Sequence, residues 1–313
     1  MEFVLVFPGQ GSQAPGMGKA LAAAHPAARE VFAAVDDALA APLGALCFEG
    51  PAEELTLTHN AQPALLAHGA AVWAVVRDAL AGKVRAAAGH SLGEFTAYHA
   101  AGALGLAAAA RLVRRRGQLM FESGVRRPGA MAAILGDTLE PIAAICERAT
   151  AEAALVVPAN YNSPGQVVIS GEEAGVERAM LLARELGAKR AIRLNVSGAF
   201  HSPLMETAVD GLSEALDKAE FTEAQFPIYS NVTADAGVSA GRARELLLKQ
   251  LTSPVRWTDE VVAMAAAHPQ ATFVEMGPGS VLVGLLKKIA PQLRTMTCGT
   301  PGDVDTLLGL AVA

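Results

Sequence analysis

Residues 84–93 read VRAAAGHSLG, so the short apolar run Val84–Ala88 leads directly into the pattern G-x-S-x-G at Gly89–Gly93. Amphipathic helical periodicity follows from Leu92 onwards. A strand, a sharp turn and a helix in this order are typical of a nucleophile elbow, in which small flanking residues permit a strained turn and expose the serine hydroxyl. The stretch therefore predicts an α/β fold with Ser91 as a nucleophile. The alternative, Ser91 as an ordinary helix N-cap, stays open.

The rest of the chain extends this pattern. Short apolar segments such as Phe3–Phe7 alternate with amphipathic helices, which indicates an α/β domain with a mainly parallel sheet. The middle segment instead predicts the order βαββαβ of a ferredoxin-like unit, with elements at Met131–Leu135, Leu139–Ala149, Leu155–Tyr161, Gln166–Ser170, Glu172–Leu186 and Ala191–Val196. We therefore predict a catalytic core made of residues 1–124 and 196–313, interrupted by an insert at residues 125–195.

The composition excludes several classes of protein. Of the 313 residues, 52% are hydrophobic and 18% are charged, so a sizeable core can form and a disordered chain is excluded. The uncharged, alanine-rich stretch Ala97–Ala110 is shorter than the ~20 apolar residues of a membrane-spanning helix, and we expect no membrane contact. The formal charge of −6 argues against nucleic acid as a partner. Three widely spaced cysteines predict neither a disulfide framework nor a zinc site, so we expect a cytoplasmic protein.

Backbone N–H groups that could stabilise an oxyanion are expected in two places. The N–H of Leu92 follows Ser91 at the start of a helix and would point toward the developing charge. The segment Phe7–Ala14 contains G-x-G-x-x-A after a strand, which resembles a dinucleotide-binding fingerprint. Two prolines crowd that turn, so a loop that donates N–H groups to an oxyanion is the better interpretation.

A hydroxyl nucleophile needs a base, and seven histidines are available. Five of them lie in or beside helical stretches, and His90 adjoins Ser91 at a turn, where neighbouring side chains point apart. His201 differs, because it directly precedes Ser202-Pro203, a favourable pair for the start of a helix. A histidine held between a strand end and a capped helix can be aimed at a site. His201 is therefore the candidate base, and a purely structural role for it stays open.

One arginine of the run Arg111–Arg116 lies on the apolar side of its predicted helix. Arg116 shares a face with Leu112, Val113 and Leu119, whereas the other arginines project elsewhere. An arginine among core residues stays charged and must find an anion. That anion is either an internal carboxylate in a buried ion pair or a carboxylate of the substrate, and both interpretations stay open.

Several motifs in order resemble the malonyl-CoA:acyl-carrier-protein transacylases of fatty-acid synthesis, and the resemblance covers nearly the whole chain. The matching segments are Phe7–Gln13, Gly89–Gly93, Arg116–Met120, Asn162–Gln166, Phe200–Ser202, Gln250 with Pro254–Trp257, and Glu275–Gly279. The resemblance implies an α/β-hydrolase-like core with a ferredoxin-like insert. It also implies that Ser91 carries the acyl group with His201 as its base, and that the main-chain carbonyl of Gln250 orients His201 in place of an acidic residue.

The resemblance further implies that Arg116 holds the malonyl carboxylate and that the N–H groups of Gln10 and Leu92 form the oxyanion hole. Three residues are expected to line the substrate groove: Asn160, Asn162 and Phe200. The implied partners are malonyl-CoA and acyl carrier protein, with no metal and no redox cofactor, and we expect a monomer. Because acyl carrier proteins are acidic, local basic pairs are expected to contact them, namely Lys189, Arg190, Lys287 and Lys288.

Three alternatives stay open beside this expectation. The first is a discrete acyltransferase that serves a polyketide synthase, which would share the same motifs. The second is a serine esterase of the α/β-hydrolase type, against which Arg116 and the long segment after His201 both count. The third is a non-catalytic module that binds carrier proteins, which the presence of Ser91, His201 and Arg116 disfavours.

Overall fold

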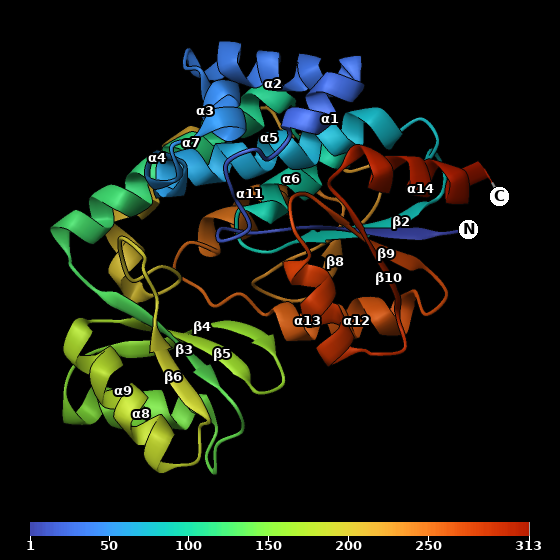
Figure 1. Cartoon of the computed structure of the whole chain (residues 1–313). Helices are drawn as coiled ribbons and strands as arrows, with labels where there is room; N and C mark the ends of the chain where they lie inside the picture. Colours follow the sequence, from blue (N-terminus) through green and yellow to red (C-terminus); the bar gives the residue numbers. More distant parts are fainter. Residues whose placement is uncertain (313) are drawn as a thin grey trace.

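Two β-sheets organise the computed structural model, which describes residues 1–312 (Figure 1). The larger sheet has the strand order β10-β9-β1-β2-β7-β8, and its neighbouring strands are parallel except for the pair β7–β8. The strands are β1 (Phe3–Phe7), β2 (Val84–Gly89), β7 (Ile228–Tyr229), β8 (Ala236–Gly237), β9 (Thr272–Met276) and β10 (Arg294–Cys298). The predicted mixed α/β architecture with a mainly parallel sheet is confirmed.

Strand β1 lies inside the larger sheet and is buried on both faces. Its odd-numbered residues pack into the main hydrophobic cluster, while Val4 and Val6 pack into a second cluster with residues of α12 (Trp257–Ala267) and α13 (Val281–Ile289). A strand covered on both faces needs apolar residues at every position, which explains why Phe3–Phe7 is a continuous apolar run rather than an alternating one.

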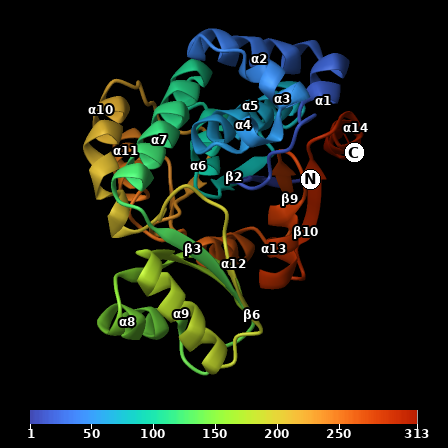
Figure 2. The same cartoon turned by 60° about the vertical axis from the view of Figure 1, so that its left-hand side comes forward.

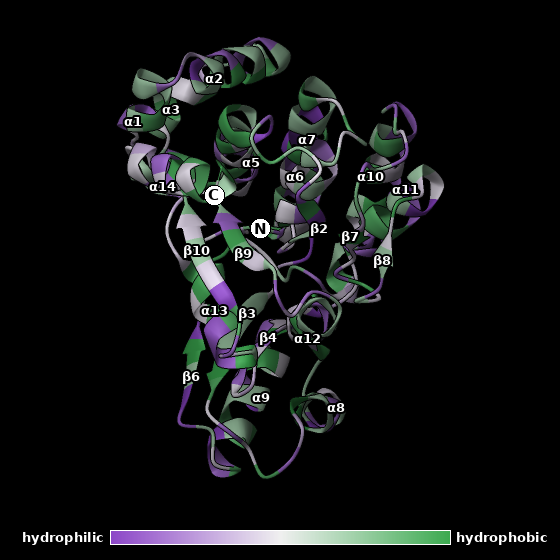
Figure 3. Cartoon of the chain, turned by 90° about the vertical axis from the view of Figure 1, so that its right-hand side faces the viewer, coloured by the Kyte–Doolittle hydropathy of each residue, from purple (hydrophilic) through white to green (hydrophobic). Residues whose placement is uncertain are grey.

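Helices cover both faces of the larger sheet (Figures 1 and 3). Helices α12 and α13 lie on one face, and most of the remaining helices lie on the other face or beyond it. These remaining elements are α1 (Lys19–Ala24), α2 (Pro26–Leu39), α3 (Leu43–Glu49), α4 (Ala52–Thr56), α5 (Thr58–Val76), α6 (Gly93–Ala100), α7 (Leu106–Arg126), the 3-10 helix η1 (Pro203–Ala208), α10 (Val209–Asp217), α11 (Ala240–Lys249) and α14 (Pro301–Val312). The sequence does not predict α3 or α4, because helices of fewer than two turns show little periodicity.

The smaller sheet is antiparallel throughout and has the order β4-β5-β3-β6. Its strands are β3 (Ala130–Leu135), β4 (Val156–Ser163), β5 (Gln166–Gly171) and β6 (Arg190–Arg193). Helices α8 (Ile142–Glu152) and α9 (Glu173–Glu185) pack on one of its faces (Figure 2). All six elements expected in the middle segment are present. Helix α8 begins three residues later than expected, because Pro141 occupies its N-cap position.

The chain passes from the larger sheet to the smaller one and back at a single place. A Cβ atom on Gly124, near the end of α7, would lie 2.0 Å from the carbonyl oxygen of Ser197, so the outgoing and returning segments touch. A third link is formed by Val255, whose N–H donates to the carbonyl of Ala159 at 2.8 Å and whose carbonyl accepts from the N–H of Tyr161 at 2.9 Å. The expected boundaries at residues 124/125 and 195/196 lie beside the first two of these segments.

Three features of residues 1–312 bear on the expected partners and the expected compartment. The helices of this part of the chain are too short or too polar to cross a bilayer. The same residues hold no cluster of three or more His, Cys, Asp or Glu side chains suited to a metal ion. Cys47, Cys146 and Cys298 are all buried and free.

Candidate active site

Ser91 lies in a strained turn between β2 and α6. Its φ is 52°, in the left-handed region that disfavours residues with a side chain. A Cβ on Gly89 would lie 1.9 Å from the carbonyl carbon of Gly93, and a Cβ on Gly93 would lie 2.2 Å from the carbonyl oxygen of Phe7. Glycine is therefore required at both positions, which is the physical reason for the G-x-S-x-G pattern in this chain.

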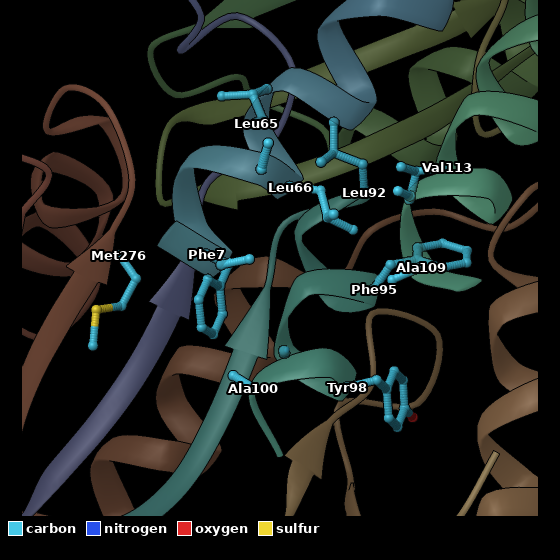
Figure 4. Close-up of a cluster of buried hydrophobic side chains, with 14 of the residues drawn as sticks. Phe7, Leu65, Leu66, Leu92, Phe95, Tyr98, Ala100, Ala109, Val113 and Met276 are labelled. Carbon is cyan, nitrogen blue, oxygen red and sulfur yellow. The ribbon is translucent and has the colours of Figure 1, made fainter. Parts of the chain in front are cut away.

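The amides expected to form an oxyanion hole lie on two adjoining segments. The side chain of Leu92 is buried in the main hydrophobic cluster, which fixes the residue after Ser91 (Figure 4). Gln10 follows β1, and the N–H of His90 donates to the carbonyl of Phe7 at 3.0 Å, so the two turns are held together. Within residues 1–312, the N–H groups of Gln10 and Leu92 have no hydrogen-bond partner. Both amides are free to donate to a substrate oxygen.

His201 is oriented by main-chain carbonyl groups. Its Nδ1 lies 2.9 Å from the carbonyl oxygen of Gln250 and 3.2 Å from that of Ser253, so Nδ1 carries the proton and donates. Its Nε2, left as an acceptor, lies 2.8 Å from the Ser91 hydroxyl oxygen. The side chain of Ser202 accepts from the N–H of Leu204 at 3.3 Å and caps η1 directly after the histidine. The geometry gives Ser91 a neutral, pre-aligned proton acceptor.

Arg116 projects from α7 into the site and is 1% exposed. Its Nη1 donates to Gln62 Oε1 at 2.9 Å, and its Nη2 donates to Gln250 Oε1 at 2.9 Å and to Ser91 Oγ at 3.1 Å. In the described part of the chain, no carboxylate lies within 4 Å of this guanidinium. The direct buried ion pair that the sequence left open is therefore absent, and two neutral glutamines hold Arg116 instead.

The charges at the site follow from burial. Desolvation lowers the pKa of Arg116 to about 10, while nearby Glu94 opposes the shift, so the guanidinium stays charged at neutral pH. Desolvation, with a smaller contribution from the charge of Arg116, lowers the pKa of His201 to about 3. The imidazole is consequently neutral at pH 7, as a general base must be.

A buried polar network lies beneath Ser91, and the sequence analysis did not identify it. The side-chain Oδ1 of Asn231 accepts from the N–H of Ser91 at 2.8 Å, and its Nδ2 donates to Glu260 Oε1 at 2.9 Å. Gln250 Nε2 donates to Glu94 Oε2 at 2.7 Å, with the carbonyl of Ser91 at 3.1 Å. Only Glu94, next to the G-x-S-x-G pattern, offered a signal: it is the one acidic residue of a short helix made mostly of apolar residues.

The three residues expected to line a substrate groove have different surroundings in the structure. Asn162 accepts through Oδ1 from His90 Nε2 at 2.8 Å, and Asn160 pairs with Val255 beside the chain that carries Gln250. Phe200 is 5% exposed and belongs to the main hydrophobic cluster. The four expected docking residues are exposed, at the start of β6 and the end of α13: Lys189, Arg190, Lys287 and Lys288.

One cavity lies away from these residues. It has a volume of about 670 Å³ and is lined by side chains that include Trp73, His99 and Phe226. None of the predicted site residues lines it.

Known proteins similar to this chain share one description. A family model described as an acyl transferase domain matches residues 4–309. The malonyl CoA-acyl carrier protein transacylase of Bacillus subtilis is 46% identical over 304 residues, which cover 97% of this chain and 95% of the relative. The crystal structure of the acyl-carrier-protein-S-malonyltransferase from Bartonella henselae superposes with a TM-score of 0.94 at 41% identity, and both chains are fully covered. A malonyl-transacylase solved in complex with a type II polyketide-synthase acyl carrier protein gives 0.93 at 42% identity, covering 99% of this chain and 100% of that one.

Proposed function

The chain belongs to the malonyl-CoA:acyl-carrier-protein transacylase family of enzymes, and on that premise we propose that it transfers malonyl groups from malonyl-CoA to the phosphopantetheine thiol of an acyl carrier protein. The groups that surround Ser91 Oγ are the main support for this proposal. Ser91 Oγ lies 2.8 Å from a neutral imidazole and 3.1 Å from a guanidinium that makes no direct ion pair with a carboxylate in residues 1–312. A base and a cation beside one hydroxyl suit an acyl group that ends in a carboxylate.

In the first half-reaction, Ser91 Oγ attacks the thioester carbonyl carbon of malonyl-CoA while His201 Nε2 takes the hydroxyl proton. The negative charge that develops on the carbonyl oxygen is stabilised by the N–H groups of Gln10 and Leu92. One such donor is worth roughly 3–4 kcal/mol of activation free energy. The C–S bond then breaks, His201 returns the proton to the sulfur, CoA leaves as the thiol, and a malonyl ester remains on Ser91.

In the second half-reaction the chemistry runs in reverse with a different thiol. The phosphopantetheine thiol attacks the ester carbonyl, His201 takes its proton and returns it to Ser91 Oγ as the C–O bond breaks. The transfer needs no change of oxidation state, and we propose that neither a metal nor a redox cofactor takes part. Arg116 holds the malonyl carboxylate through both steps, which keeps the ester where a long pantetheine arm reaches it.

Arg116 also supplies selectivity for the acyl group. An acetyl group would leave the desolvated guanidinium without an anion, and sites built on polar complementarity reject such analogues strongly. We therefore propose malonyl transfer as the main activity and acetyl transfer as a weak one. The same argument disfavours a serine esterase for neutral esters.

We further propose that the larger sheet is an α/β-hydrolase-like core and the smaller unit is a ferredoxin-like insert at residues 125–195. The sheet order β4-β5-β3-β6 with two helices on one face supports the second assignment. We also propose a monomeric, cytoplasmic enzyme, and the buried free cysteines are in keeping with a reducing compartment.

For the carrier protein we propose an acidic surface that meets the exposed basic pairs Lys189-Arg190 and Lys287-Lys288. A carrier of polyketide synthesis is a second candidate acceptor, because a relative 42% identical to this chain was solved with one. Transfer rates to a fatty-acid carrier and to a type II polyketide carrier, measured side by side, separate the two pathways.

The test of the proposed function is the intact mass of the protein after brief mixing with malonyl-CoA and acid quench. We expect one added malonyl group on the wild type and none on Ser91→Ala. An unmodified wild type, or an adduct that persists in Ser91→Ala, would overturn the assignment. Adding a carrier protein to the malonylated enzyme should then move the malonyl group to the carrier.

A further inference from the structure

Glu94 is a buried carboxyl group that the proposed mechanism does not use. It is 0% exposed and lies in the first turn of the helix that follows Ser91. Its Oε2 accepts from Gln250 Nε2 at 2.7 Å and from the N–H of Asn231 at 3.2 Å. Its Oε1 is also buried and has no hydrogen-bond partner in residues 1–312. A carboxyl group in this setting is expensive to keep charged unless a cation is near.

The buried cation beside Glu94 is Arg116, and the side-chain amide of Gln250 bonds to both residues. Gln250 accepts from Arg116 Nη2 through Oε1 and donates to Glu94 Oε2 through Nε2, so the amide relays between opposite charges. The attraction acts in both directions, because Arg116 lowers the pKa of Glu94 and Glu94 raises that of Arg116. In the absence of substrate, Glu94 is therefore the counter-charge of Arg116.

Burial disfavours the charged form of the other titratable groups that face Glu94. Burial and the charge of Glu94 raise the pKa of Glu260, on α12, well above its usual range. Burial likewise raises the pKa of Tyr98, on α6, and lowers that of His201 to about 3. The exposed Arg242, on α11, lowers the pKa of Tyr98. Arg116 is therefore the buried cation that favours the charged form of Glu94.

A substrate carboxylate at Arg116 would bring a second anion into this buried pair. We propose that Glu94 takes up one proton from solvent as the substrate carboxylate reaches Arg116. The substrate carboxylate then replaces the Glu94 carboxylate as the counter-charge of the guanidinium. This inference rests on the proposed function. The proton is placed on Oε1, which has no partner, while Oε2 continues to accept from Gln250. Glu94 is in this sense a positioning and charge-balancing residue, because it acts through Gln250 and Arg116 and does not touch the reacting atoms.

The direction of the pH dependence follows from the resting state. Burial, opposed by hydrogen bonds from Asn231 and Gln250 and by Arg116, raises the pKa of Glu94 to about 7. At pH 8 the group is mostly ionised in the empty enzyme, so malonyl binding takes up close to one proton. At pH 5 it is already protonated and binding takes up none. By linkage, affinity for malonyl-CoA falls by up to tenfold per pH unit above pH 7, measured relative to acetyl-CoA.

Titration calorimetry of Ser91→Ala tests the proposal, because this variant binds the CoA ester without being acylated. Heats measured at pH 8 in two buffers of different ionisation enthalpy give the number of protons taken up. Acetyl-CoA is the matched ligand, since its CoA portion titrates identically. We expect close to one more proton for malonyl-CoA than for acetyl-CoA at pH 8, and no difference at pH 5. Equal uptake for the two ligands at pH 8 would overturn the proposal.

Two further variants assign the proton to a residue. Ser91→Ala/Glu94→Gln should lose the extra uptake, whereas Ser91→Ala/Glu260→Gln, which alters the neighbouring carboxyl group, should retain it. Extra uptake that persists without the Glu94 carboxyl contradicts the assignment. If Glu94→Gln does not fold, the difference in proton uptake between malonyl-CoA and acetyl-CoA on Ser91→Ala still tests the proposal. A failure of the proposed function would be seen separately, as a wild-type enzyme that gains no malonyl mass.

Discussion

Replacing Arg116 with alanine removes the guanidinium that lies 3.1 Å from the Ser91 hydroxyl. The malonyl carboxylate would then enter a buried site without a cation and close to the charge of Glu94. Removing one partner of a buried ion pair costs about 3–5 kcal/mol. At about 1.36 kcal/mol per tenfold in rate, kcat/KM for malonyl-CoA should fall by roughly 150- to 5,000-fold. Acetyl-CoA carries no carboxylate, and its kcat/KM should change by less than about tenfold.

The assay is steady-state transfer from each CoA ester to one carrier protein, with kcat/KM determined for both esters. Arg111→Ala is the matched control, because Arg111 is an exposed arginine on the same helix. It should leave the malonyl-to-acetyl ratio unchanged. The side chains of Gln62 and Gln250 lose a donor in Arg116→Ala, and any resulting loss of stability affects both esters alike. Equal losses for malonyl-CoA and acetyl-CoA would therefore refute the role of Arg116 as the carboxylate partner.

Three further predictions concern the turn, the base and the carrier surface. Gly93→Ala places a Cβ 2.2 Å from a main-chain oxygen and should lower the free energy of unfolding, measured in urea, by at least about 3 kcal/mol. Gly241→Ala is the control, because open space surrounds that position, and it should be neutral or slightly stabilising. Because the pKa of His201 is lowered to about 3, acylation by the uncharged ester p-nitrophenyl acetate should stay constant from pH 8 down to pH 5; a decline with a midpoint near pH 6.5 would contradict this. Replacing Lys287 and Lys288 with glutamate should raise KM for the carrier about tenfold at low salt and leave malonylation by malonyl-CoA unchanged. If the salt dependence of transfer survives this replacement, the two lysines are not part of the docking surface.

Local patterns account for the features that could be predicted from the sequence. Ser91 lies in a five-residue motif whose glycines are required by contacts inside the turn itself, and Arg116 departs from the polar face of one helix. Both signals arise from residues close together in the chain. The parallel sheet was predictable for the same reason, because a strand buried on both faces must be a continuous apolar run.

The network beneath Ser91 could not be predicted, because its members meet only in the folded chain. Asn231 bonds the N–H of Ser91 from 140 residues away, and Gln250 reaches Glu94 across 156. Nothing in the residues around Asn231 distinguishes it from a turn asparagine. For Gln250 the family resemblance implied a role only for the main-chain carbonyl, whereas its side chain connects Arg116 with Glu94.

The place where the chain passes between the two sheets has a consequence for how such enzymes can vary. Gly124 and Ser197 are in contact, so the segment between them begins and ends at one point of the larger unit. A segment closed in this way can be lengthened, shortened or exchanged in evolution without opening the parallel sheet that holds Ser91. His201 follows the returning segment almost at once. An exchanged segment would still have to return the chain with His201 in register with Ser91, and to keep a strand beside Val255.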